Sequence, residues 1–517
     1  MENPASRVFG KNRQLKRIID MTKPHRAKAV MVLGTTSGAG KSWLTTALCR
    51  YYARQGLKVA PYKAQNMSNN ARVVAGGEIG SAQYFQALAA RAVPDVRMNP
   101  LLLKPEKDTQ SQVVLMGQVD AELSRMAWRG RSASVWPVLA QALDELLAEN
   151  DVVVIEGAGS PAEINLKASD IVNMRVALHA DAACLLVTDI DRGGAFAHLY
   201  GTWAMLDEAE RSLIKGFVLN KFRGDASLLA PGPQMLQDLT GVPTVATLPR
   251  GWQHGLPEED GVFDMAPTLG AGVSALSAEA RRSRPAVIAV IAYPRISNLD
   301  EFQPLKNVPG VRLKWVRNPA ELADADWIIL PGSKATSADL DWLRTQGLDH
   351  AIAAHAGRGG AVLGICGGLQ MLGEALIDPH GIDGNGPGLG LLPVVTVFEA
   401  AKTVQQREAQ FADVRGPWVA LSGVAVQGYE IHHGQTQPHS AMAAAGDVAY
   451  PVLPDALAWQ NGAGNVLGLY LHGLFEDPRV LQALFGAATP TLDSVFDGLA
   501  DYIGAHFEPG VLQSLLA

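Results

Sequence analysis

The sequence predicts an α/β protein of two domains, each built around a parallel β-sheet. The chain has 517 residues, and single hydrophobic cores rarely grow beyond about 250 to 300 residues, so one domain is too few. Hydrophobic residues make up 48% of the chain and charged residues 18%, which is typical of a well-packed globular enzyme. Short apolar runs recur, each followed by a Gly-rich turn and a helical pattern, and this order is typical of parallel βαβ units.

The expected strands form two series, one for each domain. The first series lies at residues 28–33, 57–61, 151–155, 183–188, 216–220 and 242–248. The second series lies at residues 286–292, 311–316, 327–330, 361–365 and 466–471. Between the series, residues 256–285 are rich in Gly, Ala, Ser and Pro and lack strand alternation, which predicts a linker. We therefore expect domains at 28–255 and 286–517, with a C-terminal helical segment at 492–516 that packs on the second domain.

Charge, hydropathy and cysteine content exclude several classes of protein. Lys and Arg number 44 against 51 Asp and Glu, a net charge of −7, without the basic stripe that a nucleic-acid partner requires. No apolar run approaches the ~20 residues of a membrane-spanning helix, and residues 1–27 are basic but lack the apolar segment of an export signal. Three scattered cysteines are too few for a disulfide framework. We expect a flexible basic extension at 1–27 and a cytoplasmic protein without membrane insertion; the sequence does not report its oligomeric state.

A glycine-rich loop follows the first strand and leads straight into a helix-forming segment. Its residues are Gly34, Thr35, Thr36, Ser37, Gly38, Ala39, Gly40, Lys41 and Ser42. Small residues let backbone N–H groups close around a phosphate at a helix N-terminus, the lysine adds charge, and the serine hydroxyl can ligate Mg²⁺. The loop therefore predicts ATP binding. Its glycine stands one place earlier than in the strict P-loop pattern, and this spacing resembles dethiobiotin synthetase and its relatives, which phosphorylate a carboxylate with ATP.

Polar residues follow other strands of the first domain, at the sheet edge where ligands bind in open α/β folds. Glu156 is expected to hold Mg²⁺ together with Ser42, unless it caps the next turn; Asp189 is a further metal candidate. Asn220 is expected to contact the nucleotide base, with a simple turn as the alternative. Lys63 stands where dethiobiotin-type enzymes place a lysine, and this resemblance implies contact with the reacting carboxylate or phosphate.

The second domain contains a strand, a tight Gly-Ile-Cys-Gly-Gly turn and an apolar helix, with Cys366 at the turn. Small neighbours permit the strained backbone of a nucleophile elbow, and the helix N-terminus lowers the thiol pKa and offers the Gly367 N–H to an oxyanion. Cys366 is therefore the expected nucleophile. We interpret Cys49 and Cys184 as small buried hydrophobes.

A thiol nucleophile needs a base, and His472 directly follows a predicted strand. By pattern alone, His432 and His433 are equally possible. The elbow and the late histidine resemble the class I glutamine amidotransferases, a flavodoxin-like fold in which cysteine and histidine hydrolyse glutamine to glutamate and ammonia. That resemblance implies His472 as the base. The segment containing Gly332 and Ser333 is similar to the second oxyanion-hole segment of that family.

The third member of the expected triad is open. Most class I amidotransferases carry glutamate two residues after the histidine, where this chain has Leu474. Glu476 and Glu430 are the acidic residues nearest in the two motifs, but neither occupies the family position. The missing glutamate and the Gly-Tyr-Glu-Ile-His-His-Gly motif at 428–434 resemble the cobyric acid synthase and cobyrinic acid diamide synthase branch.

Three polar segments of the first domain, 61–70, 78–83 and 98–105, are dense in amides and hydroxyls. Such groups suit a polar substrate with carboxylates and amides, unless they only bond their own loops. The segments contain Lys-Ala-Gln-Asn-Met-Ser, Glu-Ile-Gly-Ser-Ala-Gln and Met-Asn-Pro-Leu-Leu-Leu-Lys-Pro, which are similar to signature stretches of the cobyric acid synthase family. The candidate substrate residues are Gln65, Asn66, Ser68, Asn69 and Asn99.

The resemblance covers nearly the whole chain from about residue 28 and implies a glutamine-hydrolysing amidoligase. Members amidate the b, d, e and g carboxylates of adenosylcobyrinic acid a,c-diamide, a corrinoid, using ATP, Mg²⁺ and glutamine, with no tightly bound cofactor expected. We also expect an internal passage for ammonia. The alternatives are cobyrinic acid a,c-diamide synthase, a P-loop partitioning ATPase and a bare glutaminase subunit. The intact cysteine elbow argues against the partitioning ATPase, and the fused P-loop argues against the bare glutaminase subunit.

Overall fold

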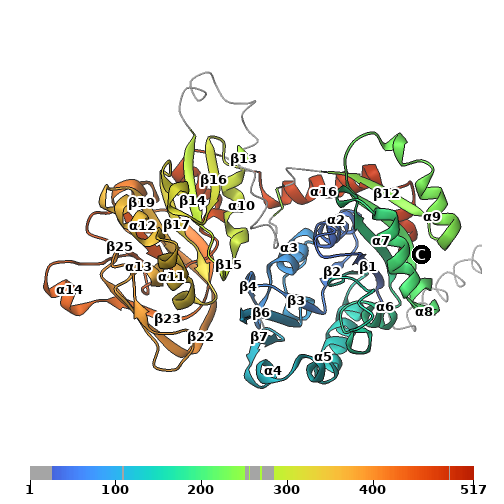
Figure 1. Ribbon diagram of the computed structural model, residues 1–517, viewed down its shortest axis with the longest axis horizontal. Helices are drawn as coiled ribbons and strands as arrows, with labels where there is room; N and C mark the ends of the chain where they lie inside the picture. The colour runs from blue at the N-terminus through green and yellow to red at the C-terminus, as the bar shows by residue number, and fades with distance from the viewer. Residues whose placement is uncertain (1–25, 108–109, 251–254, 257–267, 270–284, 488–489) are drawn as a thin grey trace, which may run out of the picture.

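The computed structural model describes residues 26–107, 110–250, 255–256, 268–269, 285–487 and 490–517. It consists of two α/β bodies, one containing β1 and the other β14, which lie side by side in Figure 1. Most of the expected extension and linker lies outside the described residues. No helix in the described part of the chain is long and apolar enough to cross a membrane.

The first domain is built on a six-stranded parallel sheet with the order β12-β11-β10-β1-β9-β2. Its strands are β1 (Lys28–Gly34), β2 (Val59–Tyr62), β9 (Val152–Glu156), β10 (Ala183–Asp189), β11 (Ile214–Phe222) and β12 (Thr244–Pro249). Helices cover both faces, so the strands are apolar along their length; Val30 to Leu33, for example, are fully buried. The covering helices include α2 (Lys41–Arg54), α3 (Ser81–Ala89), α5 (Trp128–Glu149), α6 (Met174–Ala180), α7 (Ala195–Met205) and α9 (Gly232–Thr240).

An insertion between β2 and β9 forms small sheets that the sequence analysis did not anticipate. A four-stranded sheet has the order β3-β6-β7-β8, and β4 pairs with β5 in a hairpin. The strands are β3 (Gln65–Met67), β4 (Ala71–Val74), β5 (Gly77–Gly80), β6 (Leu101–Lys107), β7 (Gln110–Leu115) and β8 (Gln118–Asp120). This insertion carries the polar segments that resemble the family signatures, and it faces the second domain.

The second domain contains an eight-stranded sheet with the order β13-β16-β14-β17-β19-β26-β25-β24, parallel in its centre and antiparallel at both edges. The strands are β13 (Thr268–Leu269), β14 (Ala286–Ile291), β16 (Val311–Val316), β17 (Trp327–Leu330), β19 (Ala361–Ile365), β24 (Tyr450–Leu453), β25 (Ala458–Gln460) and β26 (Val466–Leu469). Helices α11 (Thr336–Thr345), α12 (Leu348–Gly357) and α13 (Gly367–Leu372) pack beside it. A long antiparallel pair, β22 (Val394–Gln410) and β23 (Ala425–Pro438), reaches towards β4 of the first domain.

The C-terminal helices pack on the first domain, so the prediction that residues 492–516 pack on the second is wrong. Helix α16 (Leu492–His506) lies along α2 (Figure 1), and its apolar face joins the same buried cluster. In α17 (Val511–Ser514), Leu512 O accepts a hydrogen bond from the Tyr52 hydroxyl at 2.8 Å. Helical periodicity shows that one face is buried, but it does not show which domain covers that face.

Candidate active sites

The glycine-rich loop after β1 has the geometry of a phosphate-binding loop. Gly38 and Gly40 have positive φ angles of 69° and 98°, which glycine adopts without steric cost. A side chain at position 40 would also collide with Asn220, because an added Cβ would lie 2.0 Å from its Nδ2. The predicted loop, residues 34–42, leads directly into α2, which begins at Lys41. Backbone N–H groups at such a helix N-terminus favour a bound phosphate.

Two of the predicted nucleotide-binding side chains hold this loop in shape. Lys41 Nζ donates to the carbonyl oxygens of Thr36, at 3.0 Å, and Gly159, at 3.2 Å. Asn220 Nδ2 donates to Ala39 O at 2.9 Å. Both side chains therefore reach the loop, while contact between Asn220 and a nucleotide base stays a prediction.

Glu156 lies at the end of β9, buried against the loop. Its Oε1 accepts hydrogen bonds from Ser42 Oγ at 2.8 Å and Lys63 Nζ at 2.7 Å, and its Oε2 accepts from Gln86 Nε2 at 2.5 Å. Burial alone would raise the pKa of Glu156, but the Lys63 charge and the three hydrogen bonds outweigh burial and hold the pKa below its usual value. The carboxylate is therefore ionised at neutral pH. The structure thus brings together three residues predicted for this site, Ser42, Lys63 and Glu156.

The Ser42 hydroxyl and the Glu156 carboxylate fit Mg²⁺. Both present hard oxygen atoms beside the phosphate loop, and Mg²⁺ is usually held by one or two carboxylates together with substrate phosphates. Asp189, the further metal candidate, has a different environment: its carboxylate lies 3.1 Å from Lys221 Nζ and 3.4 Å from Arg192 Nε. Lys221 Nζ also donates to Gly38 O at 2.8 Å. Asp189 therefore positions Lys221, which in turn contacts the phosphate-binding loop.

The predicted substrate residues all lie in or next to the insertion; they are Gln65, Asn66, Ser68, Asn69 and Asn99. Asn99 Oδ1 accepts from Gly80 N at 3.0 Å, and its Nδ2 donates to Lys63 O at 3.1 Å. Ser68 Oγ accepts a backbone N–H two residues along the chain at 3.0 Å. Ser68 thus bonds its own loop, which is the alternative that the sequence left open, whereas Asn99 links the backbones of two other segments at Gly80 and Lys63. Asn69, between β3 and β4, lines the cavity that also contains the cysteine elbow.

Cys366 occupies a sharp turn between β19 and α13. Its φ and ψ angles are 52° and −106°, a backbone conformation that residues other than glycine rarely adopt. The neighbouring glycines are required by close packing: an added Cβ on Gly364 would lie 2.6 Å from the backbone of Gly368, and one on Gly368 would lie 1.9 Å from Leu330 O. This strained strand–turn–helix geometry is that of a nucleophile elbow.

The three predicted oxyanion-hole residues lie at this elbow. A Cβ added to Gly367 would lie 2.8 Å from Ser333 N, and one added to Gly332 would lie 3.0 Å from His472 Cε1. The Ser333 and Gly367 backbones are therefore adjacent beside the thiol, and the Gly332 backbone borders the histidine ring. Two adjacent backbone N–H groups can stabilise a developing oxyanion.

His472 is buried beside Cys366, whose thiol donates to Ile431 O at 3.7 Å. Burial alone would lower the pKa of His472, but the charge of Glu301, followed by that of Cys366, raises it to about 10. A raised pKa makes the His472 ring a stronger proton acceptor next to the thiol. The ring also stacks on Tyr429, with 5.3 Å between ring centroids.

Glu301 is the acidic partner of His472, and it was not predicted from the sequence. It is fully buried in a short 3₁₀ helix, Leu299–Phe302; its Oε1 lies 3.1 Å from His472 Nδ1, and its Oε2 accepts from Gly473 N at 3.0 Å. A carboxylate in this position fixes the tautomer and orientation of the imidazole. The acidic pair Asp300-Glu301 amid apolar residues was the available signal, but nothing in the spacing connects it to the histidine.

The remaining histidines and acidic candidates have other partners. His432 Nδ1 lies 2.8 Å from Gly434 O, and its Nε2 lies 2.9 Å from Glu430 Oε2, so both ring nitrogens are engaged. His433 Nδ1 lies 3.1 Å from Glu399 O. Glu430 therefore pairs with His432, and Glu476, the other acidic candidate, pairs with an arginine of the first domain.

That arginine, Arg72 in β4, ties the first domain to the segments that hold His472. Arg72 is buried, and its guanidinium donates to Glu476 Oε1 and Oε2 at 2.6 and 2.7 Å and also bonds Asp300. It lies 5.1 Å from the centre of the Tyr429 ring, the ring that stacks on His472. One cation of the first domain thus fixes both the residue next to Glu301 and the turn that follows the histidine.

Comparison with known proteins identifies both halves of the chain. Residues 30–252 match the CobQ/CobB/MinD/ParA nucleotide binding domain, and residues 287–480 match the CobB/CobQ-like glutamine amidotransferase domain. The chain is 85% identical to the cobyric acid synthase of Polaromonas naphthalenivorans (strain CJ2), over 95% of this chain and 100% of the relative. It is 75% identical to the cobyric acid synthase of Variovorax paradoxus (strain S110), over 95% of this chain and 99% of the relative. The chain belongs to the cobyric acid synthase family.

Proposed function

We propose that the protein amidates the b, d, e and g carboxylates of adenosylcobyrinic acid a,c-diamide, using ATP and glutamine, to give adenosylcobyric acid in cobalamin biosynthesis. Membership of the cobyric acid synthase family supports this substrate. The observation that carries the proposal is the presence, in one chain, of a phosphate loop beside Glu156 and Lys63 and of a cysteine elbow beside a buried histidine that pairs with Glu301.

In the amidotransferase domain, Cys366 Sγ attacks the side-chain amide carbon of glutamine. His472 takes the thiol proton and passes a proton to the leaving ammonia, while Glu301 orients the ring and stabilises its charged form. The backbone N–H groups of Gly367 and Ser333 lie where they can stabilise the tetrahedral oxyanion. Water then hydrolyses the thioester and releases glutamate.

In the synthetase domain, the substrate carboxylate attacks the γ-phosphorus of ATP, ADP leaves, and the resulting acyl phosphate is attacked by ammonia to give the amide and inorganic phosphate. The loop at 34–42 binds the phosphates, and Lys41 offsets charge on the transferring phosphoryl group. Ser42 and Glu156 would hold Mg²⁺, which supplies further charge neutralisation when bound. Lys63 Nζ lies 2.7 Å from Glu156 Oε1, and this nearness to the proposed Mg²⁺ ligand supports the proposal that Lys63 contacts the reacting carboxylate.

The three cysteines are free and buried, and the proposed nucleophile works only as a reduced thiol. We therefore keep the reducing cytoplasm as the proposed location. The proposed partners are small molecules alone: the corrinoid, ATP and glutamine.

Mass spectrometry of the product tests the proposal. Purified protein is incubated with cobyrinic acid a,c-diamide in its adenosyl form, MgATP and glutamine, and the corrinoid mass is followed with time. Four successive carboxylate-to-amide conversions are expected. Amidation of the a and c carboxylates of cobyrinic acid instead would assign the protein to the diamide synthase activity, and no conversion with ATPase and glutaminase activities intact would refute the corrinoid substrate.

A further inference from the structure

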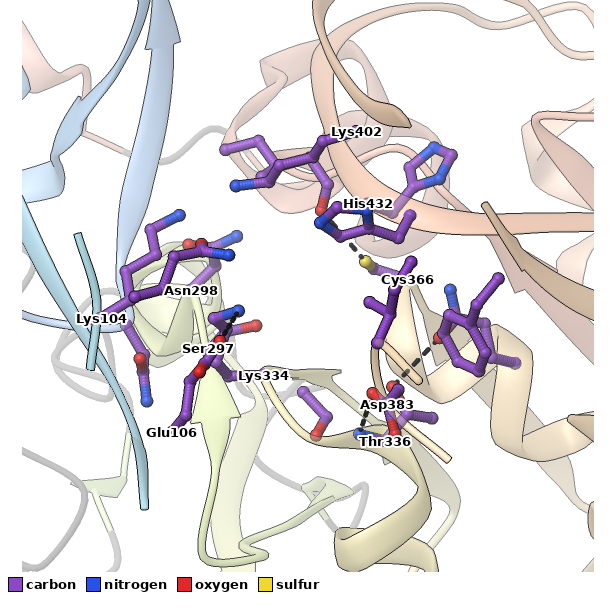
Figure 2. Close-up of a pocket in the computed structure, with 18 residues that line it drawn as sticks. Lys104, Glu106, Ser297, Asn298, Lys334, Thr336, Cys366, Asp383, Lys402 and His432 are labelled. Atoms are coloured by element: carbon purple, nitrogen blue, oxygen red, sulfur yellow. Dashed lines mark hydrogen bonds and ion pairs between the residues drawn. The ribbon is translucent and has the colours of Figure 1, made fainter. Parts of the chain in front are cut away.

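Cys366 opens into a cavity of about 300 Å³ that lies between the two domains. Figure 2 shows the thiol on one side of this cavity and Lys104 and Glu106, both from β6 of the first domain, on the opposite side. Asn69 and Gln112 of the first domain also line it. The glutaminase site is thus enclosed partly by a domain that takes no part in its chemistry.

The wall opposite the thiol carries an unusual concentration of lysines. Lys104 is only 3% exposed and pairs with the buried Glu78, which also accepts from Lys402 Nζ at 2.6 Å. Lys334, from the amidotransferase domain, pairs with Glu106 at 3.0 Å. Three ammonium groups therefore share two carboxylates at this wall.

Burial and neighbouring ammonium groups both disfavour the charged forms of Lys104 and Lys334. Burial, together with the charges of Lys402 and Lys334, outweighs the attraction of Glu78 and lowers the pKa of Lys104 to about 7. Burial and Lys402 likewise lower the pKa of Lys334. An anion bound at this wall would relieve the repulsion.

The other acid that lines the cavity does not supply this anion. Asp383 lies near the elbow in Figure 2, and its two carboxylate oxygens accept from Thr336 N at 2.8 Å and Ser337 N at 2.7 Å, at the start of α11. It therefore caps a helix and leaves the positive wall unchanged.

Glutamine supplies groups that match the cavity at both ends. Its side-chain amide must reach Cys366, which leaves the α-carboxylate and α-ammonium groups towards the rest of the cavity. Charge-assisted hydrogen bonds between ammonium and carboxylate are among the strongest that a protein makes. The α-carboxylate is complementary in charge to Lys104, Lys334 and Lys402. Glu106 and the Asn69 side chain also line the cavity and can accept hydrogen bonds from the α-ammonium group.

We propose that Lys104 of the synthetase domain binds the α-carboxylate of glutamine, so that the glutaminase site is complete only when the two domains are docked. The proposal rests on the function proposed above, since it assigns the nitrogen donor to this cavity. It also means that a separated amidotransferase domain would lack the anchor for its own substrate.

The test compares glutamine with glutaminamide, in which the α-carboxylate is replaced by a neutral amide. The wild-type protein is expected to prefer glutamine in kcat/KM, measured as γ-amide hydrolysis. Lys104→Met should lower that preference by roughly 10- to 100-fold, the range for a hydrogen bond to a charged group, mainly through KM for glutamine. Synthesis with added ammonium should keep its wild-type rate.

Lys104→Arg is the matched control, because it keeps a cation at this position while it changes the packing of the wall. If Lys104 merely supported the structure, both variants would weaken glutamine use alike; the proposal expects Lys104→Arg to retain most of the preference for glutamine over glutaminamide. Lys402→Met, at the more exposed partner of Glu78, is a second variant expected to reduce the preference in the same direction.

Two outcomes would overturn the proposal. In the first, the preference for glutamine persists in Lys104→Met. In the second, Lys104→Met raises KM for the corrinoid in ammonium-dependent synthesis, which would assign Lys104 to binding of the corrinoid. Failure of the corrinoid assay itself would be distinguishable, because the preference for glutamine over glutaminamide is measured without the corrinoid.

Discussion

Replacing Glu301 by glutamine tests the triad with almost no change in side-chain shape. In the native site the two carboxylate oxygens have different neighbours, His472 Nδ1 at 3.1 Å and Gly473 N at 3.0 Å. An amide can satisfy the Gly473 N–H with its oxygen only if its NH₂ group faces Nδ1. The imidazole must then carry its proton on Nε2, the wrong tautomer for accepting the proton of Cys366.

The expected loss is about 10³- to 10⁴-fold in the rate of glutamine hydrolysis, about 4 to 5.5 kcal/mol of transition-state stabilisation, as for loss of the triad carboxylate in serine proteases. The assay measures glutamate release in Glu301→Gln and, in parallel, amidation with added ammonium. Ammonium-dependent amidation should be unchanged, because the synthetase site is separate.

Glu430→Gln is the control, since Glu430 was the acidic alternative beside the histidine motif and bonds His432 at 2.9 Å instead. It should retain glutamine hydrolysis within about tenfold of the wild-type rate. A Glu301→Gln protein that hydrolyses glutamine as fast as the control would refute the assignment of Glu301 to the triad.

Four further predictions concern the two sites and their interface. Cys366→Ser should abolish glutamine-dependent amidation but keep activity with ammonium, and loss of both would contradict separate sites. Lys41→Ala should block synthesis with either nitrogen donor while glutamate release continues; normal amidation would contradict the phosphate-loop assignment. Arg72→Met removes the arginine partner of Glu476 and Asp300. Urea unfolding should therefore show that the free energy of unfolding falls by about 3 to 5 kcal/mol, and an unchanged midpoint would contradict this reasoning. Burial alone would raise the pKa of Glu78, but its two lysine partners lower it to about 2. The stability that ionised Glu78 contributes should therefore be complete above pH ~4.5 and lost as the pH falls towards 2. Glu78→Gln should remove this contribution, so that Tm falls less steeply between these pH values than in the wild type.

Features encoded within a few consecutive residues could be predicted from the sequence. The α/β class with its two domain types is confirmed, as is the family resemblance. The phosphate loop and the elbow at Cys366 are each a strand, a glycine turn and a helix in one short stretch, so local sequence carries nearly all of their geometry.

Features that depend on long-range contacts could not be predicted. Glu301 meets His472 across 171 positions of sequence, and the usual motif position holds a leucine. Asn99 and Ser68 are amide and hydroxyl residues in substrate-like stretches, but buried backbone groups compete for the same side chains. The insertion strands escaped notice because residues 101–103 are a short apolar run among polar residues, which periodicity alone does not assign.

The return of α16 to the first domain means that the chain passes between the domains twice, once before β14 and once between α15 (Pro478–Phe485) and α16. Two covalent connections hold the facing surfaces at a high effective concentration, so an interface that opens recloses as an intramolecular event. A cut in the linker would leave the two fragments still joined non-covalently through α16 and α2. A fragment of the first domain alone would expose the apolar face of α2 that Phe496, Leu499 and Ile503 otherwise cover, so the halves are best studied by site-specific substitution within the intact chain.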